Sequence, residues 1–368
     1  MKAQPAQSHP IALDSRNFRA RSAVVSVIIP CRNERDHIEA CIESVLNLEP
    51  PPGDFEIIVV DGMSDDGTRE VLKELAQVQK RLRIIENPQR TTACALNLGI
   101  REARGKYIAV MGAHNQYADD YLTACFDVLE NTGAENVGGS MQCVGETWLQ
   151  RAIAIAHHSP FSVGGARWHD TSYEGRADTV FGGFYRREVF DRIGFFDESL
   201  IRNQDDELNL RLTRAGATIW HSPRVRSWYH PRSSLLSLFR QYLQYGYWKV
   251  RIIQKHRVPA SIRHLVPGSF LLALLFLPLV GLVSSFALWL WLALIVLYTC
   301  CTVGASIVTA AKKGWIYLPI LPIVFTCYHF GYGLGFLKGI LDFVVLRRTA
   351  SASFTVLTRA STSPLQRL

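Results

Sequence analysis

The stretch Val24–Glu34 reads VVSVIIPCRNE, an apolar and mostly β-branched run that ends in polar and charged residues. Such a run is typical of a buried strand. Outward from it, short apolar runs alternate with longer helical patterns; the predicted strands are 24–29, 56–60, 82–86 and 107–111, and the predicted helices are about 34–48, 67–79 and 92–104. This alternation indicates an α/β fold with a Rossmann-like, doubly wound and mostly parallel sheet.

Polar residues follow each predicted strand, at 30–34, 61–68, 87–90 and 112–116. Ligands of parallel sheets bind beyond the carboxyl ends of the strands, where these segments meet. Asp61 stands directly after the second strand, and a carboxylate there can accept hydrogen bonds from a nucleoside. We therefore expect Asp61 to contact a ligand and Asp65 and Asp66 to cap the following helix. The region 132–235, rich in Gly, His, Trp and Arg, is expected to form the acceptor half of a cleft.

The C-terminal third is apolar enough to exclude a wholly soluble protein. Between residues 265 and 341 the only charged residues are Lys312, Lys313 and Lys338. The runs 267–283 and 286–308 are each long enough to cross a membrane, and the break at Ser284 and Ser285 predicts a helical hairpin. A third segment, 315–341, contains prolines and glycines and can span, break or re-enter. The cationic tail favours a broken or re-entrant form, because lysine and arginine prefer the cytoplasmic side.

The net charge of +8 and pI near 9.1 do not indicate nucleic-acid binding, because no recognition motif accompanies them. Basic and aromatic residues just before the apolar block instead predict an amphipathic helix at a lipid surface. No apolar leader precedes the first strand, and the eight cysteines form no C-x-x-C pair. We expect free thiols in a reducing cytosol. The expected organisation is an arm at 1–22, an α/β domain at 23–235, an interfacial segment at 236–264, a membrane region at 265–345 and a polar tail at 346–368.

Spaced motifs in this order resemble glycosyltransferase family 2, which has the GT-A fold. They are P-x-R-N-E at 30–34, V-D-G-x-S-x-D-G-T at 60–68 and N-x-G-I-x-x-A-x-G-x-Y-I at 97–108, followed by the strings at 182–187, 193–198 and 204–212. The resemblance covers about residues 24–250. In the membrane region, HFGYGLGF at 329–336 is similar to succinoglycan-type exopolysaccharide glucosyltransferases of bacteria.

The resemblance implies an inverting transfer from a nucleotide sugar, most often a UDP-hexose, to a polyprenyl-linked saccharide. Exopolysaccharide or cell-envelope glycan synthesis at the plasma membrane is implied, with a cytoplasmic catalytic domain, a multi-pass anchor and other assembly proteins as partners. Asp205 falls at the family's catalytic base, with Gln204 replacing a Glu, whereas Asp206 and Glu207 suit a solvated helix N-terminus. Implied donor-nucleotide contacts are Pro30, Arg32, Glu34, Asp61, Arg90 and Asn97. Implied acceptor or diphosphate contacts are Gly183, Arg240, Gln241 and Trp248.

The chain departs from the family at the metal-binding D-x-D motif, where it carries Gly112-Ala113-His114. A divalent cation, Mn²⁺ or Mg²⁺, is implied by the family, and His114 is the candidate ligand, although imidazole suits Mn²⁺ better than Mg²⁺. Asn115 or Asp119 and Asp120 are alternative ligands, and Lys or Arg side chains are an alternative to the metal. The lost carboxylates also leave open a non-catalytic subunit that binds sugar nucleotides. The Q-x-x-R-W motif of processive synthases is not reproduced near Trp248, which argues against a polymerase.

Overall fold

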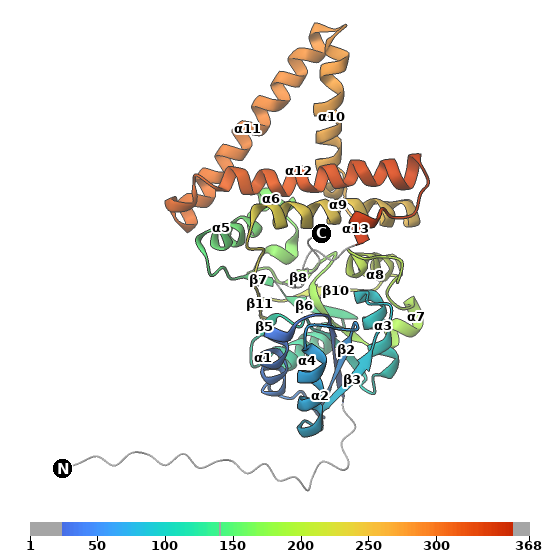
Figure 1. Ribbon diagram of the computed structural model, residues 1–368. Coiled ribbons are helices and arrows are strands. Elements are labelled where there is room, and N and C mark those ends of the chain that lie inside the picture. The colour runs from blue at the N-terminus through green and yellow to red at the C-terminus, as the bar shows by residue number, and fades with distance from the viewer. Residues whose placement is uncertain (1–23, 140, 356–368) are drawn as a thin grey trace, which may run out of the picture.

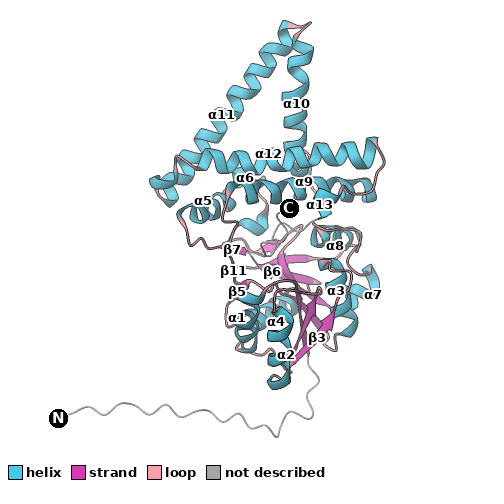
Figure 2. Cartoon of the chain, viewed as in Figure 1, coloured by secondary structure: helices cyan, strands magenta, loops and turns pink. Residues whose placement is uncertain are grey.

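The computed structural model of the protein describes residues 24–139 and 141–355. Its centre is an eight-stranded sheet in the order β3-β2-β1-β4-β9-β6-β10-β8, beside a three-stranded sheet in the order β5-β11-β7. Figure 2 shows the strands in magenta, with helices packed around them. The strands are β1 Val25–Cys31, β2 Phe55–Asp61, β3 Leu82–Glu86, β4 Tyr107–Val110, β5 Asn115–Tyr117, β6 Asn136–Gly139, β7 Met141–Cys143, β8 Gly175–Arg176, β9 Phe181–Arg186, β10 Ile219–His221 and β11 Ser227–Tyr229.

The first half of the large sheet is parallel, as the alternating pattern predicts. β1 pairs with β2 and β4, and β2 pairs with β3, all in parallel register. The second half is mixed, because β9 runs antiparallel to both β4 and β6, while β6 and β10 are parallel. The register places Cys31 opposite Asp61, so the segments that follow β1 and β2 leave the sheet side by side.

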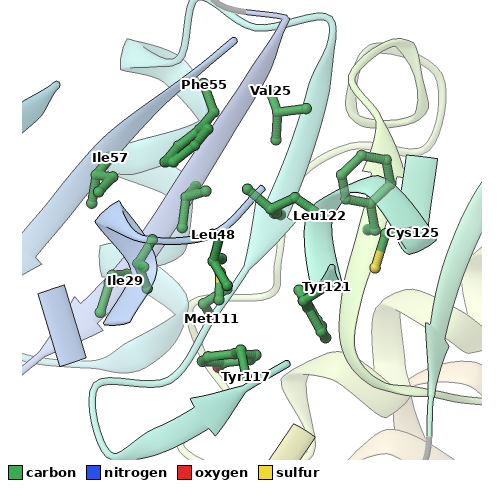
Figure 3. Close-up of a cluster of buried hydrophobic side chains, with 14 of the residues drawn as sticks. Val25, Ile29, Leu48, Phe55, Ile57, Met111, Tyr117, Tyr121, Leu122 and Cys125 are labelled. Atoms are coloured by element: carbon green, nitrogen blue, oxygen red, sulfur yellow. The ribbon is translucent and has the colours of Figure 1, made fainter. Parts of the chain in front are cut away.

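Helices cover both faces of the large sheet. On one face α1, α2 and α4 bury a cluster that includes Ile42, Leu72 and Leu122, and Figure 3 shows part of it around Ile29. On the other face α3, α7 and α8 bury a second cluster around Ile28. The bounds are α1 Arg35–Leu46, α2 Thr68–Val78, α3 Thr92–Glu102, α4 Tyr121–Thr132, α5 Trp148–His157, α6 Pro160–Val163, α7 Glu188–Ile193 and α8 Gln204–Arg214, with the 3₁₀-helix η1 at Arg167–His169.

The C-terminal part consists of two helices that lie against the α/β domain and a hairpin that projects away from it (Figure 1). The helices are α9 Leu235–His256, α10 Val266–Gly281, α11 Ser285–Lys313, α12 Leu321–Gly339 and α13 Ala352–Thr355, with short helices η2 Ile262–His264, η3 Trp315–Tyr317 and η4 Ile340–Val345. Among the described residues, two helical segments are long and apolar enough to cross a membrane, 262–281 and 285–313. The hairpin predicted around Ser284 and Ser285 is therefore present.

The third apolar segment does not continue the hairpin. α12 turns back and lies beside α9 across the base of the hairpin (Figure 1). The two helices approach closely at glycines: a Cβ added to Gly335 would lie 1.9 Å from the carbonyl oxygen of Leu243. α9, expected as an interfacial helix, is consequently covered by α12, and its residues 246–250 are all buried. The arm 1–22 and the end of the polar tail, 356–368, lie outside the described residues.

Candidate active site

The loops after β1 and β2 are hydrogen-bonded to each other at the carboxyl edge of the parallel strands. The Asn33 side chain donates to the Asp65 carboxylate at 2.9 Å and accepts from the Asp65 N–H at 3.0 Å. The backbone N–H of Asn33 donates to Ser64 Oγ at 2.9 Å, and the N–H of Glu34 donates to Thr68 Oγ1 at 3.0 Å. These bonds fix both loops in one arrangement before any ligand binds.

Asp61 is the last residue of β2 at this edge of the sheet and is 1% exposed. Its carboxylate accepts a 2.5 Å bond from Ser64 Oγ and a 3.1 Å bond from the Ser64 N–H, and Arg69 Nε lies 3.5 Å away. Pro30, Arg32 and Glu34 stand on the neighbouring strand end, so the structure brings four of the expected donor contacts together. Arg90 is exposed in the loop after β3, in left-handed backbone conformation.

Asn97 has a different position from the one expected of a donor contact. It is 1% exposed on α3, and its amide nitrogen donates to the Phe196 carbonyl at 2.9 Å and to the Glu198 carboxylate at 2.8 Å. Its amide oxygen accepts from the Phe196 N–H at 2.9 Å. Because these bonds engage both ends of the amide, the Asn97 side chain anchors the 196–198 turn, and the expected nucleotide contact stays a prediction.

Asn87, which the sequence marks only as part of the polar segment 87–90, lies next to Asp61. Its N–H donates to the Asp61 carbonyl at 2.7 Å, and its side-chain Nδ2 donates to the Thr91 carbonyl at 2.9 Å. Its side-chain Oδ1 is buried without a hydrogen-bond partner among the described residues. Buried polar atoms normally have a partner, so this oxygen is an acceptor available to a donor at the sheet edge. The only sequence signal was its place directly after a strand.

His114 stands after β4, in the loop where the family carries D-x-D. Its Nδ1 lies 3.2 Å from Glu34 Oε1, so the structure joins two expected site residues from different loops. Within residues 24–139 and 141–355, no group of three His, Cys, Asp or Glu side chains could hold a metal ion. The alternative ligand Asp120 is instead paired with Arg226 at 3.0 Å, and Asn115 is 7% exposed with its amide nitrogen 3.4 Å from the Tyr117 hydroxyl.

A cavity of about 450 Å³ lies between the α/β domain and the C-terminal helices. Its walls come from α5, α6, η1, α8, α9, α12 and the start of α10, and Asp205 at the first turn of α8 faces into it. Tyr229 also lines the cavity, and its ring centroid lies 6.2 Å from that of His114. The cavity therefore adjoins the sheet edge that carries Glu34 and His114.

Asp205 is exposed to the interior of this cavity. Desolvation by the surrounding protein, followed by repulsion from the Asp206 carboxylate, raises its pKa to about 6. Asp206 forms a 2.5 Å ion pair with Lys249 of α9, which is only 4% exposed. Burial opposes ionisation of Asp206, but Lys249 prevails and holds the pKa of Asp206 below its usual range. The two adjacent carboxyls thus differ in charge state in mildly acidic solution.

Glu207 is fully buried, which corrects its assignment to a solvated helix end. Its carboxylate contacts Arg211 Nε at 3.0 Å, Lys255 Nζ at 2.9 Å and His256 Nε2 at 2.8 Å. Arg211 also donates to the carbonyl oxygens of the 193–195 segment. Asp206 is likewise paired rather than solvated. The ion pairs of Glu207 with Lys255 and His256 join α8, which carries Asp205, to α9. The sequence indicates only the pair of Glu207 with Arg211, through their i to i+4 spacing.

The four expected acceptor or diphosphate contacts are dispersed. Gln241 lines the cavity, where its Oε1 accepts from Arg232 Nε at 3.1 Å. Gly183 lies on β9, where φ is +97° and an added Cβ would strike the Tyr185 ring. Arg240 is exposed on α9 outside the cavity lining. Trp248 is 3% exposed and its indole N–H donates to the Phe354 carbonyl at 3.0 Å, so this donor is bonded within the protein; the expected contact stays a prediction.

Comparisons with known proteins identify the family to which this chain is similar. Residues 26–194 match the model of glycosyl transferase family 2. The chain is 32% identical to the succinoglycan biosynthesis protein ExoA of Rhizobium meliloti over 86% of its own length and 95% of that protein. It is 28% identical to the dolichyl N-acetyl-alpha-D-glucosaminyl phosphate 3-beta-D-2,3-diacetamido-2,3-dideoxy-beta-D-glucuronosyltransferase of Methanococcus voltae, over 86% of this chain and 98% of that one.

A solved mannosyltransferase from Pyrobaculum calidifontis, in complex with GDP-mannose and Mn²⁺, has the same fold. Its TM-score is 0.54 at 19% identity, with 87% of this chain and 88% of that chain covered. The strand order and the hydrogen-bonded loops after β1 and β2 are consistent with this fold. The match to ExoA extends over most of both chains. The chain belongs to glycosyltransferase family 2 and is a glycosyltransferase with a GT-A domain and two candidate C-terminal membrane helices.

Proposed function

We propose that the protein transfers a sugar from a nucleotide sugar to a lipid-linked saccharide, with inversion at the anomeric carbon, in exopolysaccharide or envelope glycan synthesis. The observation that carries this proposal is the position of Asp205, in a cavity that reaches from the carboxyl edge of the sheet to the base of the hairpin. The names of the relatives support it: one acts in succinoglycan biosynthesis and the other is named for a dolichyl phosphate saccharide.

In this mechanism the donor nucleotide lies against the edge formed by Asp61, Arg32 and Glu34. The acceptor hydroxyl occupies the cavity and attacks C1 of the donor sugar from the face opposite the diphosphate. As the new C1–O bond forms and the bond to the diphosphate breaks, the hydroxyl proton passes to Asp205. With its pKa at about 6, this carboxyl is mostly ionised at neutral pH and still basic enough to accept a proton.

Glu34 and His114 are the residues that would hold a divalent cation. One carboxylate and one imidazole 3.2 Å apart form a donor pair that suits Mn²⁺, and the diphosphate of a donor would supply further oxygen ligands. Such an ion would neutralise charge on the leaving group. The chain itself contributes cations near the same edge, Arg32 from the loop after β1 and Arg90 from the loop after β3.

The proposed orientation places the α/β domain in the cytoplasm, where nucleotide sugars are made. α10 and α11 form a hairpin, and α12 lies across its base, so the chain returns to the side from which it entered. Lys312 and Lys313 at the end of α11 then lie on the cytoplasmic side, as lysines near membrane helices prefer. The proposed location is the plasma membrane, with a multi-pass anchor.

The test is transfer of radiolabelled sugar from a panel of nucleotide sugars into a membrane lipid extract by the purified full-length protein. The Asp205→Asn variant is the matched inactive control, because it keeps the shape of the side chain and removes the base. Label that enters the lipid fraction only with the unaltered chain supports the proposal. Nucleotide binding without transfer from any donor would instead support a non-catalytic subunit.

A further inference from the structure

Helices α12 and η4 present two faces with different surroundings. One face packs on α9 through glycines: a Cβ added to Gly331 or Gly335 would lie 2.9 or 1.9 Å from a carbonyl oxygen of α9. Another face carries an apolar stripe, whose members are alternately four and three residues apart: Ile323, Cys327, Phe330, Leu334, Leu337 and Leu341. This spacing places them on one side of the helix. The apolar stripe is therefore a surface distinct from the contact with α9.

Much of the apolar stripe is exposed, and its middle contacts the hairpin. Ile323, Leu334 and Leu341 are 50%, 40% and 44% exposed. Between them the Phe330 ring lies 6.0 Å from the Phe270 ring of α10, measured between centroids, and α11 also contacts α12. Because α12 lies across the base of the hairpin (Figure 1), the stripe extends the apolar surface of the two candidate membrane helices. An exposed apolar surface that continues a membrane anchor is suited to contact with lipid.

The apolar stripe is flanked by cations at both ends. Lys312 and Lys313 end α11 ahead of it, Arg347 and Arg348 follow it, and all four are exposed. The one carboxylate between these two pairs, Asp342, is 3% exposed and so contributes little to the surface. Lysine and arginine next to an apolar surface favour the anionic headgroups of a membrane. The charge of this segment therefore suits an anionic lipid surface.

The residues of η3 add an exposed aromatic group at one end of the stripe. Trp315 and Ile316 follow the lysines at the end of α11 and are 60% and 67% exposed. The Tyr317 ring stacks on the ring of Trp148 in α5, with 6.3 Å between their centroids. Tryptophan and tyrosine are enriched where a membrane meets water, whereas lysine is depleted in interfaces between proteins. Exposed tryptophan beside exposed lysine therefore favours a lipid surface over a protein partner.

The packing of α12 on α9 decides which of the two helices can reach lipid. The sequence predicts an interfacial segment at 236–264, but α12 covers α9 and residues 246–250 are buried. α12 itself contacts both α9 and the hairpin. Its residues Tyr328 and Tyr332 line the cavity that contains Asp205. One face of α12 is therefore available to lipid, while other residues of the same helix form a wall of the cavity.

We propose that the apolar stripe of α12 and η4 lies in the lipid at the surface of the membrane, parallel to that surface, and that the cations at its ends contact anionic phospholipid headgroups. The inference rests on the membrane anchor of the proposed function and is independent of the transfer chemistry. It assigns α12 to the membrane surface rather than to a third span. The α/β domain is then attached by two kinds of lipid contact, the inserted hairpin and the half-immersed helix α12.

The experiment measures the depth of spin labels on the full-length protein in nanodiscs of phosphatidylcholine and phosphatidylglycerol. Collision of each label with oxygen, which concentrates among lipid chains, is compared with its collision with a water-soluble nickel chelate. The parent chain loses the cysteines that are not buried, through the substitutions Cys143→Ala, Cys300→Ala, Cys301→Ala and Cys327→Ala. Thermal unfolding and UDP binding of each labelled variant report whether the fold survives.

Labels are placed on the apolar stripe by Ile323→Cys, Leu334→Cys and Leu341→Cys. Leu297→Cys, at an exposed position near the middle of α11, is the lipid control, and Val78→Cys, at the exposed end of α2, is the water control. The three stripe labels should share one depth, between the depths of the two controls. A spanning α12 would instead separate the labels at 323 and 341 by about 27 Å, because a helix rises about 1.5 Å per residue, and that result would overturn the inference.

The preference for anionic lipid is measured with spin-labelled phospholipids in the same nanodiscs. Phosphatidylglycerol should associate with the protein more strongly than phosphatidylcholine, and Lys312→Gln with Lys313→Gln should lower this preference by up to about fivefold per lysine. Lys73→Gln, at an exposed position of α2, is the matched control and should leave the preference unchanged. Equal association of the two lipids with the unaltered chain would overturn the headgroup contact.

The labels also separate failure of this inference from failure of the proposed function. Stripe labels as exposed to water as the label on α2, with the α11 label in lipid, would overturn the inference and leave this face to a protein partner. An α11 label in water would refute the membrane anchor and, with it, the inference. Stripe labels in lipid without sugar transfer from any donor would refute the proposed transfer and leave the lipid contact standing.

Discussion

The titration of Asp205 should govern the pH dependence of sugar transfer. A base with a pKa of about 6 is roughly 91% ionised at pH 7 and roughly 9% ionised at pH 5, so kcat/KM should fall about tenfold between them. Asp205→Asn should lower turnover by about 10²–10⁴ and abolish this acid limb, with nucleotide binding retained. The assay is initial transfer rate from a radiolabelled donor at subsaturating acceptor concentration, measured from pH 5 to pH 8.

Asp206 provides the internal control for this reasoning. Its carboxylate raises the pKa of Asp205 and Lys249 lowers it, so Asp206→Asn removes the repulsion and leaves the cation. The acid limb should therefore move to lower pH in Asp206→Asn. Asp191→Asn, which removes an exposed carboxylate of α7, should leave the profile unchanged. An acid limb that stays at the same pH in Asp206→Asn, or near-normal transfer by Asp205→Asn, would refute the assignment of the base.

The same pKa shift has a consequence for stability. Because the folded-state pKa of Asp205 is raised, the folded protein binds more protons than the unfolded chain between about pH 4 and pH 6. The contribution of Asp205 to stability is therefore present at low pH and is lost as the pH rises through about 6. Asp205→Asn should consequently raise Tm at pH 7 and leave it nearly unchanged at pH 4. A lower Tm at pH 7 would mean that the ionised carboxylate stabilises the fold.

Three further predictions concern the donor edge and the anchor. Asp61→Ala should weaken UDP binding at least about tenfold, measured by calorimetry, because it removes a buried acceptor at the strand end; unchanged titration would contradict its role. Activity should favour Mn²⁺ over Mg²⁺ and be lost in EDTA and in His114→Ala; full activity in EDTA would mean that side chains alone neutralise the diphosphate. A reporter fused after residue 368 should be active only in the cytoplasm; activity only outside would reverse the proposed topology.

The sequence predicted the parallel half of the sheet well, because its signals are local. Strands such as β1 are buried on both faces, and their apolar runs and polar ends are visible without any knowledge of their neighbours. The antiparallel placement of β9 was not predicted, since pairing partners far apart in the sequence leave no periodic trace. For a related reason, the sequence did not decide whether the segment that forms α12 spans the membrane. Its apolar composition suits both a membrane span and a helix buried against α9.

The site residues show the same difference between local signals, which the sequence contains, and long-range contacts, which it does not. The positions of Asp61, Glu34 and His114 at the sheet edge were predicted from motifs next to strand ends, because position in the chain fixes position at that edge; their roles in binding stay predictions. Asn97 and Trp248 are buried and hydrogen-bonded within the protein, which a motif does not reveal, and their expected ligand contacts stay predictions. Most of the residues that line the cavity were missed individually, although the composition of 132–235 indicated an acceptor region. Their proximity is created by the packing of α9 and α12, which is a tertiary effect.

The place where the cavity meets α10 has a kinetic consequence. Withdrawing a lipid chain from a bilayer costs about 0.8 kcal/mol for each methylene group, so a long polyprenyl tail cannot leave the membrane to react. A cavity that begins at Val266 requires only the headgroup to rise, while the tail stays among its neighbours. In the proposed orientation the enzyme meets its acceptor by diffusion within a surface. Its rate then depends on the mole fraction of acceptor in the membrane, and diluting that lipid with others slows the enzyme at constant bulk concentration.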